Sequence, residues 1–506
     1  MRSRLSPVLA GVATFVALLV LHLPLLHLPY FWDEAGYYVP AALDFSRAGQ
    51  LVPSSTLPVG HTPLVMVYLG LVWRVFGYTP LVTRAAIALM AAAVLVVLYK
   101  LAREAAGREA ALWSALLLAL SPLFFAQSTL VHLDLTAALF TTLAVLFLLR
   151  GQLWLFAAGA SLAILSKETA VVLLPVAWLY TWKAQRRPVA GRWTRRAAAP
   201  LVAPLAVAAA WALYYHHATG YWTGNREYLS YNLYGTLSPV RIFWTFLRRA
   251  YELFVGGFNW LVVAAAAVGL WWGRKRGPSG SAVVANDTCW RSLVFLAGGL
   301  IAVYLLLLSV VGGAVLPRYL LPVFPLFYLV AVAWILRLPR RPARWVLSFV
   351  AASFVGAWFI NPPCPFPYED NLSYADFIRL HQQAAGFLEK QPGRPRILTA
   401  WPATDELTEP RLGYVARRLE VVPIESFAPG DVAAARDGSF DLLYLYSRKW
   451  EPPGNWMTRF PAWLRMQERY FDYRPQASFE DLAARYHLRP VAEFQRRGQW
   501  VRIYTH

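Results

Sequence analysis

The sequence is built from apolar runs of about the length that a membrane-spanning helix needs, and this feature constrains the fold more than any other. A helix of about 20 apolar residues crosses the hydrocarbon core of a bilayer. Only 15% of the residues are charged, against about 25% in a soluble protein. The pattern predicts a polytopic α-helical membrane protein with about 11, and up to 13, spans. The runs lie at 8–29, 80–102, 109–127, 134–149, 152–166, 168–183, 198–217, 258–273, 292–312, 319–336 and 345–360.

Basic residues between these runs indicate the orientation, because Lys and Arg are enriched in cytoplasmic loops. With the N-terminus inside, the first outward loop, 30–61, holds a single basic residue, Arg47. The net charge of +20 therefore reflects topology and anionic lipid headgroups, and we expect no nucleic-acid partner. We expect a multi-pass protein of a bacterial-type inner (plasma) membrane, with a cytoplasmic N-terminus. The basic inward segments are 1–7, 100–108, 183–197, 274–291 and 337–344.

The chain divides into two predicted domains. Residues 1–360 form a transmembrane domain with a large first outward loop, 30–79, whereas residues 361–506 carry charges at ordinary density and lack an apolar run of spanning length. With an odd number of spans, this second domain lies outside the membrane as an extracytoplasmic α/β domain. Its expected strands are Ile397–Ala400, Leu419–Ile424 and Leu442–Tyr446. Apolar residues at helical spacing predict helices near 457–469 and 478–486.

The first outward loop opens with two adjacent carboxylates, Asp33 and Glu34, within the sequence Phe-Trp-Asp-Glu-Ala-Gly-Tyr-Tyr. Adjacent carboxylates repel each other and partial burial raises a carboxyl pKa, so one of them can act as a base. Such a base takes the proton from an acceptor hydroxyl in a glycosyl transfer. The alternative is a helix start, with Asp33 as the cap and Glu34 favouring the helix dipole. Position alone leaves both interpretations open.

Other polar residues fall at the outward ends of the apolar runs. His61 precedes a Pro-started amphipathic segment, and its alternative is a solvated loop histidine. Asp134 follows His132 at the next outward turn, where it can simply cap a span. These positions suit an anion site and a helix start equally well.

Two further outward turns carry cations. Lys167 and Glu168 interrupt two apolar runs and are either functional or a self-neutralising pair. Arg318, next to Tyr319, is the single charge between Ser292 and Leu336, and it either binds phosphate or snorkels to the interface. All of these residues share one predicted surface, which suits an anionic amphiphile and a general base.

In these motifs the chain resembles the GT-C class of integral-membrane glycosyltransferases, in particular bacterial dolichyl-phosphate-mannose protein mannosyltransferases and the lipid A aminoarabinose transferase. The resemblance covers about residues 1–360. The family often has two prolines after its His or Lys, whereas here Thr62 precedes a single Pro63. The matching elements, in order, are Asp33 and Glu34; His61, Pro63 and Leu64; His132 and Asp134; Lys167 and Glu168; and Arg318, Tyr319 and Pro322.

The resemblance implies an inverting transfer of a monosaccharide from a polyprenyl-phosphate donor to an extracytoplasmic protein, lipid or glycan acceptor. It implies that Asp33 is the catalytic base, with Glu34 beside it. It assigns no cofactor and no metal ligands. The residues expected to bind the carrier phosphate or the sugar are His61, Asp134, Lys167, Glu168, Arg318 and Tyr319. Five aromatic residues either line the membrane interface or close over the sugar: Tyr221, Trp222, Tyr228, Tyr231 and Tyr234.

Two other functional classes of membrane protein remain open for this sequence. A transporter or flippase for a lipid-linked or anionic solute would place its ionisable residues near the middle of the bilayer. A non-catalytic assembly protein would bind envelope partners through the outer domain and would not need the Asp33–Glu34 loop.

Overall fold

The computed structural model describes residues 7–506 apart from 59, 186–194, 277–286, 437, 453–455, 472, 474–481 and 483–484. The chain forms two compact units. A helical unit contains Met1–Leu23 and Ala41–Trp358, and an α/β unit contains Pro24–Pro40 and Phe359–His506. The segment Pro24–Pro40 thus packs with the C-terminal residues, which the sequence did not predict.

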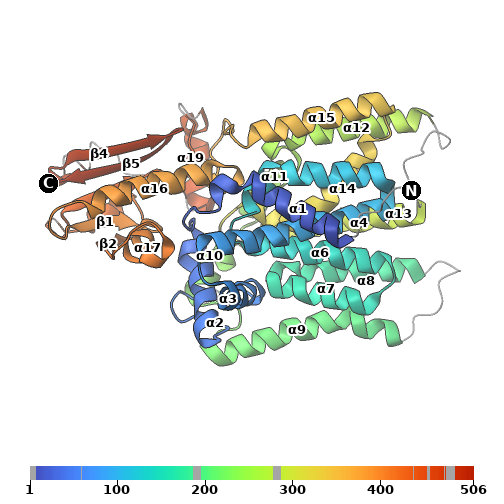
Figure 1. The fold of residues 1–506 in the computed structure, drawn as a ribbon, viewed down its shortest axis with the longest axis horizontal. Helices are drawn as coiled ribbons and strands as arrows, with labels where there is room; N and C mark the ends of the chain where they lie inside the picture. The colour runs from blue at the N-terminus through green and yellow to red at the C-terminus, as the bar shows by residue number, and fades with distance from the viewer. Residues whose placement is uncertain are drawn as a thin grey trace. The chain divides into compact units, whose positions relative to one another are not determined.

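Helices lie on the apolar runs of the first 360 residues (Figure 1). They are α1 (Pro7–Leu21), α2 (Val39–Ala48), α3 (Leu64–Phe76), α4 (Pro80–Leu120), α5 (Pro122–Gln127), α6 (Leu133–Leu149), α7 (Leu153–Ser166), α8 (Leu173–Gln185), α9 (Arg195–Thr219), α10 (Arg226–Asn232), α11 (Pro239–Phe254), α12 (Asn259–Arg276), α13 (Asp287–Val310), α14 (Phe324–Ile335) and α15 (Arg340–Ala357). The short 3-10 helices are η1 (Leu23–Leu25), η3 (Glu168–Val172), η4 (Tyr234–Thr236), η5 (Gly256–Phe258) and η7 (Pro317–Val323).

Five helices in the described part of the chain are long and apolar enough to cross a membrane: Pro80–Leu120, Ala198–Thr219, Gly256–Lys275, Asp287–Val310 and Pro317–Ile335. Shorter apolar helices are Val8–Leu21, Leu64–Phe76, Leu133–Leu149 and Leu153–Ser166. The predicted multi-pass helical class is confirmed, while the number of spans stays a prediction.

Helix α4 is divided at Gly107, whose φ of 85° and ψ of 179° are not helical. This backbone region is open to glycine because glycine has no Cβ. A straight helix of 41 residues would be about 60 Å long, twice the thickness of the hydrocarbon core. The glycine therefore separates two apolar parts, which correspond to the predicted runs 80–102 and 109–127.

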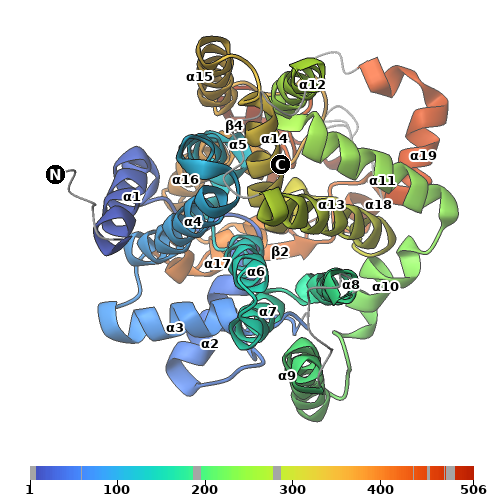
Figure 2. The same ribbon diagram turned by 90° about the vertical axis from the view of Figure 1, so that its right-hand side faces the viewer.

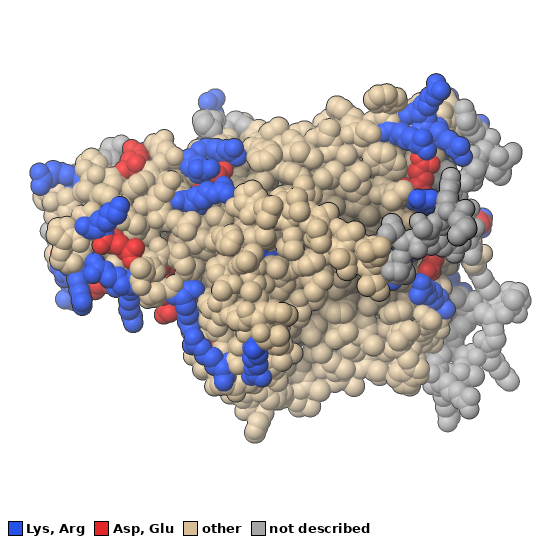
Figure 3. Space-filling model, viewed as in Figure 1, with Lys and Arg blue, Asp and Glu red and all other residues tan. Residues whose placement is uncertain are grey.

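The helices differ in how deeply they are buried within the helical unit. The most apolar part of Pro317–Ile335 is 89% buried, whereas that of Ala198–Thr219 is 22% buried. Figure 2 looks along the helices and shows α14 with α4 and α6 in the interior, and α9 at the edge. Over the length of the helices, the face drawn in Figure 3 is almost free of charged side chains. Such a surface suits contact with lipid.

One end of the helical unit gathers segments that were predicted to face inward. Arg344 Nε lies 2.8 Å from Glu109 Oε1, and Arg150 forms an ion pair with Glu104. These contacts join the segments around 104–109, 150 and 344 at the same end. The loops that carry the candidate site residues lie at the opposite ends of the same helices. Which end faces the cytoplasm stays a prediction.

The α/β unit contains one five-stranded sheet of order β2-β1-β3-β5-β4. Strands β2, β1 and β3 are parallel, and β5 and β4 complete the sheet as an antiparallel hairpin. The three predicted strands correspond to β1, β2 and β3. The second predicted helical period, 478–486, lies mostly outside the described residues. The elements are η2 (Glu34–Tyr38), η8 (Tyr368–Asp370), α16 (Ser373–Glu389), β1 (Arg396–Ala400), α17 (Ala403–Thr408), η9 (Pro410–Leu412), β2 (Glu420–Ile424), α18 (Pro429–Ala433), β3 (Leu442–Tyr446), η10 (Trp456–Arg459), α19 (Pro461–Phe471), β4 (Arg489–Arg496) and β5 (Gln499–Thr505).

We predict that Gly269→Ala destabilises the helical unit, because α12 packs closely on α14 at this glycine. A Cβ at Gly269 would lie 2.2 Å from the carbonyl oxygen of Trp334, which is backbone and cannot turn away. The expected loss is about 1–3 kcal/mol, measured as a lower thermal midpoint in detergent. Gly298→Ala is the matched control, since a Cβ there meets nothing within 4 Å. Equal midpoints for the two variants would contradict the close packing.

Candidate active site

The Asp33–Glu34 loop belongs to the α/β unit and has an unusual backbone. Residues Glu34–Tyr38 form one turn of π-helix, and Trp32 before it has a positive φ of 45°. Both features concentrate at functional sites, where the surrounding structure holds a strained backbone in place. The loop is thus a fixed element and not a solvated linker.

The two carboxylates of this loop lie in different environments. Glu34 is fully buried, and its Oε2 accepts the backbone N–H of Phe31 at 2.7 Å. Asp33 is half-buried, and its side chain makes no capping hydrogen bond to the helix that follows. Glu34 therefore holds the loop together, while the interpretation of Asp33 as a helix cap does not fit.

In the helical unit, four predicted or neighbouring residues form a buried charged cluster, defined as His132, Asp134, Lys167 and Arg318. Lys167 Nζ lies 2.5 Å from Asp134 Oδ1, and Arg318 Nε lies 3.6 Å from Asp134 Oδ2. All three side chains are less than one tenth exposed. Asp134 thus pairs with two cations from other segments, and Arg318 does not snorkel to the surface.

His132 connects this cluster to the turn before α6. Arg318 Nη1 lies 2.6 Å from His132 Nε2, and His132 Nδ1 lies 2.6 Å from Gln127 Oε1. Because guanidinium can only donate, Nε2 is the acceptor and Nδ1 carries the proton that it donates to Gln127. Burial, together with the positive charges of Arg318 and Lys167, holds the pKa of His132 well below its usual value. The histidine is therefore a neutral link that orients Arg318.

The ring of Tyr319 gathers three cations. Lys167 Nζ lies 3.7 Å from the ring centroid, and the guanidinium carbons of Arg249 and Arg318 lie at 5.3 and 5.5 Å. Asp134 is one carboxylate against this group, and Glu252 accepts from Arg249 at 3.0 Å. Glu168 also acts on Lys167, whereas Arg248, which shares Glu252, and the buried Arg84 near His132 add two further cations. Five cations against three carboxylates leave the surroundings of the cluster and Tyr319 net positive. The arrangement can hold an anion.

Arg249 was missed in the sequence analysis. It is fully buried on α11 and also donates to the carbonyl oxygen of Leu316 at 2.6 Å. The signal was present in the sequence, because outward loop 218–257 carries four arginines against the positive-inside rule. Two of them, Arg241 and Arg248, donate to carbonyl oxygens of the chain between Gly312 and Val315. These arginines therefore fasten α11 to the segment that leads to Arg318.

His61 and Glu168 form a second pair beside the cluster. His61 Nδ1 lies 3.3 Å from the Glu168 carboxylate, and the His61 ring meets Tyr228 edge to face at 5.8 Å. Gly60 allows this approach, since a Cβ there would lie 2.6 Å from the backbone nitrogen of Gly224. Lys167 and Glu168 thus form their direct ion pairs with different partners, Asp134 and His61.

Of the five aromatic residues of the second large outward loop, Tyr228 contacts a predicted site residue, His61. The others are exposed, as expected for an interfacial belt: Tyr221, Trp222, Tyr231 and Tyr234.

The structure therefore brings together all the predicted site residues of the helical unit, with Arg249 added. Asp33 and Glu34 belong to the α/β unit and are described there. In the part of the chain that the structure describes, no three His, Cys, Asp or Glu residues are grouped so that they could hold a metal ion. The residues brought together are His61, His132, Asp134, Lys167, Glu168, Arg318 and Tyr319.

Residues 60–215 match the model of the dolichyl-phosphate-mannose-protein mannosyltransferase family. The structure is similar to that of ArnT from Cupriavidus metallidurans bound to undecaprenyl phosphate, with a TM-score of 0.58 and 16% identity over 97% of each chain. The apo structure of the same protein gives a TM-score of 0.58 and 17% identity, over 98% of this chain and 97% of that one. No curated protein sequence matches the chain.

These comparisons confirm the resemblance that the sequence predicted. The family match gives the enzyme class, a glycosyltransferase, and the two structures give the fold.

We predict that Lys167→Met strongly destabilises the helical unit, because it leaves Asp134 buried without its nearest cation. Removing one partner of a buried ion pair costs about 3–5 kcal/mol, to be measured by denaturation in mild detergent. Arg150→Met is the matched control, since its pair with Glu104 is exposed and such pairs contribute about 1 kcal/mol or less. Similar losses in the two variants would show that Asp134 does not depend on Lys167.

Proposed function

We propose that this glycosyltransferase, whose residues 60–215 match the mannosyltransferase family model, moves a monosaccharide from a polyprenyl-phosphate carrier to an acceptor hydroxyl. The acceptor is an extracytoplasmic protein, lipid or glycan. The enzyme lies in a bacterial-type inner membrane, with the N-terminus in the cytoplasm and the α/β unit outside. The observation that carries the proposal is the buried, net-positive group of Lys167, Arg249 and Arg318 around Tyr319.

The carrier phosphate binds at these cations. Arg318, oriented by His132 and Asp134, supplies a fixed guanidinium charge, and Lys167 supplies a compact point charge. Cations fixed in a buried site stabilise the negative charge that grows on the leaving phosphate. His61, held by Glu168, stands beside them as a further donor. The similar ArnT structure was solved with undecaprenyl phosphate, a ligand of this chemistry.

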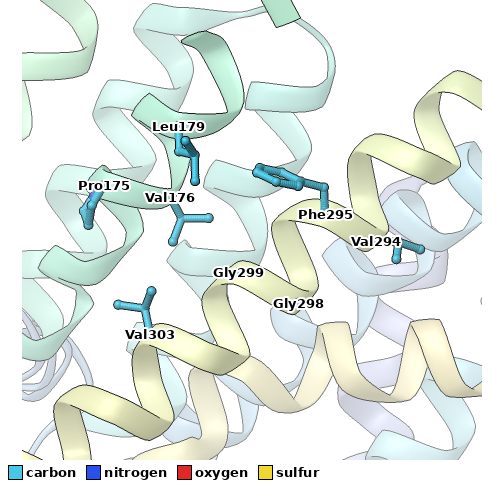
Figure 4. Close-up of a pocket in the computed structure, with 8 residues that line it drawn as sticks. All are labelled: Pro175, Val176, Leu179, Val294, Phe295, Gly298, Gly299 and Val303. Carbon is cyan, nitrogen blue, oxygen red and sulfur yellow. The ribbon is translucent and has the colours of Figure 1, made fainter. Parts of the chain in front are cut away.

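The prenyl tail lies in an apolar groove of about 450 Å³ between α8 and α13. Figure 4 shows Val176 and Leu179 of α8 facing Phe295 and the two small residues Gly298 and Gly299 of α13. The remaining lining residues are Pro175, Val294 and Val303. Both helices connect directly to the cations, because α8 follows Lys167 through η3 and α13 precedes Arg318 of η7. The proposed sites of the anionic head and the apolar tail are thus linked through the same two helices.

In the reaction, the Asp33 carboxylate takes the proton of the acceptor hydroxyl. The acceptor oxygen forms a bond to the anomeric carbon on the side opposite the phosphate. The bond from that carbon to the phosphate oxygen breaks, and the bonding pair leaves with the polyprenyl phosphate, so that the anomeric configuration inverts. Glu34 keeps its hydrogen bond to the loop backbone and so maintains the direction of Asp33.

The position of the charges along the helices supports an enzyme over a transporter. A transporter binds its substrate near the middle of the bilayer, at broken helices. Here Asp134 is the second residue of α6, Lys167 follows the last residue of α7, and Arg318 is the second residue of η7. All three stand at the ends of the predicted spans 134–149, 152–166 and 319–336, and none lies near the middle of a span.

We predict that Asp33→Asn lowers kcat for sugar transfer by about 10³-fold or more, because general-base catalysis contributes about 10²–10⁴-fold. Purified protein would be incubated with polyprenyl-phosphate sugars and envelope extract, and donor consumption would be followed.

The matched control is Asp44→Asn in the same loop. Asp44 accepts the backbone N–H groups of Ser54 and Ser55 at 2.8 Å, and an amide oxygen accepts them equally, so its activity stays near that of wild type. An Asp33→Asn variant with near-wild-type activity would refute the mechanism.

We predict that Gly298→Leu raises the KM for a long-chain donor about tenfold and leaves the KM for a short-chain analogue unchanged. The added side chain fills groove volume in which a Cβ has no neighbour within 4 Å, so the tail loses apolar contact worth about 1.4 kcal/mol. Leu306→Phe enlarges an exposed position of the same helix and serves as the control. Equal effects on both donors would place the tail elsewhere.

A further inference from the structure

The sheet of the α/β unit has a point where the chain changes direction. Strand β1 lies between β2 and β3 in the parallel half, so β2 is added on one side of β1 and β3 on the other. In open α/β sheets, ligands bind beyond the carboxyl ends of the strands at such a switch point. Here the residues at that edge are Trp401, directly after β1, and Ser447 and Arg448, directly after β3.

The Asp33–Glu34 loop lies at this edge. A Cβ on Gly36 would be 2.8 Å from Trp401 Nε1, so the loop backbone rests against the indole ring. Trp32 meets Trp401 edge to face at 5.4 Å, and the guanidinium of Arg448 lies 5.9 Å from the Trp32 ring. The side chains that follow β1 and β3 thus contact the residues on both sides of Asp33.

Two hydrogen bonds within the α/β unit hold Trp401 in place. Its Nε1–H donates to Asp405 Oδ2 at 3.0 Å, and its carbonyl oxygen accepts the hydroxyl of Tyr446 at 2.7 Å. Burial raises the pKa of Asp405 to about 6, although the bond from Trp401 opposes this rise. Near neutral pH the carboxylate is therefore mainly ionised and accepts the indole N–H. The indole plane against Gly36 is set by α17 and β3.

The residues before Asp33 are held by the same unit. The hydroxyl of Tyr414 donates to the carbonyl oxygen of Tyr30 at 3.0 Å. Phe31 packs edge to face on Phe377 of α16 at 5.4 Å, and Trp32 meets the same ring at 5.6 Å. Phe377 stacks on His381 at 3.9 Å, and His381 forms a buried pair with Glu406 of α17. The ring of Tyr37 also lies 5.8 Å from that of Trp401. Contacts of the α/β unit therefore extend along the loop from Tyr30 to Tyr37.

We propose that the carboxyl edge of β1 and β3 is a built-in receptor for the loop 30–38, and that Trp401 and Asp405 are positioning residues for Asp33. The catalytic part of this inference rests on the proposed function. Where other sheets of this kind hold a separate ligand, this unit holds a segment of its own chain. This edge fixes the direction of the Asp33 carboxylate. Trp401 itself does not contact the reacting atoms.

The test compares hydrogen–deuterium exchange of residues 31–38 with steady-state kinetics, on the full-length protein in detergent. In Trp401→Leu, we expect exchange about tenfold faster, since aromatic pairs contribute about 0.5–1.5 kcal/mol each. We expect kcat to fall about tenfold or more, with the KM for the polyprenyl-phosphate donor within about twofold of wild type. Asp405→Ala removes the acceptor of the indole N–H and should change both measurements in the same direction as Trp401→Leu, whereas Asp405→Asn, which keeps an acceptor, should restore them.

Gly36→Ala provides a second variant that leaves the core of the α/β unit unchanged, and it should act in the same direction as Trp401→Leu. Trp500→Phe changes a tryptophan of β5 that contacts Arg502, and it should alter neither measurement. Unchanged exchange of residues 31–38 in Trp401→Leu and Gly36→Ala would overturn the inference, as would faster exchange without a loss of kcat.

A loss that appears only in the donor KM would also overturn the inference. If the wild-type protein turned over no donor, the proposed function would fail separately. The exchange data alone would then decide whether this edge holds the loop.

Discussion

The burial of Asp134 between Lys167 and Arg318 is the interaction on which the arrangement of the helical unit depends. A lone charge in an apolar interior is far too costly to keep, so the segments that carry these three residues have to come together at one end of the helices. The partners lie 2.5 and 3.6 Å from the carboxylate, and His132 and Tyr319 complete the surroundings of the two cations. The result is a buried site with spare positive charge next to apolar helices.

The two neighbouring carboxylates of the first outward loop differ in burial and in hydrogen bonding, and therefore in role. Glu34 is buried and accepts a backbone N–H, so its charge is used to hold the loop. Asp33 stays half-buried, after a residue with a positive φ. A strained backbone of this kind persists only where surrounding contacts outweigh its cost, and here aromatic rings and hydrogen bonds of the α/β unit supply them.

Sequence reasoning predicted the helices and most of the charged site, because a bilayer demands long apolar runs and makes every ionisable residue near them conspicuous. It named Lys167 and Arg318 as candidates, and the structure places both beside Asp134. It could not tell that Glu168 pairs with His61, since pairing depends on packing. Arg249 was overlooked because loop arginines are common. Strands β4 and β5 were missed because the predicted strands were short buried apolar runs. β4 is mostly exposed, and polar or charged residues interrupt the apolar residues of both strands. The packing of Pro24–Pro40 with residues 359–506 produces no local pattern in the sequence, so it became visible only in the structure.

That packing has a consequence for how the polypeptide is made. The segment Pro24–Pro40 leaves the ribosome more than 300 residues before the partners that cover Phe31 and Trp32. At about 5–20 residues per second, the loop waits roughly 17 to 75 s with its aromatic side chains uncovered. During this interval it is exposed to chaperones, proteases and the membrane surface. Maturation of the loop is thus a late event of biogenesis, although it is encoded near the start of the chain.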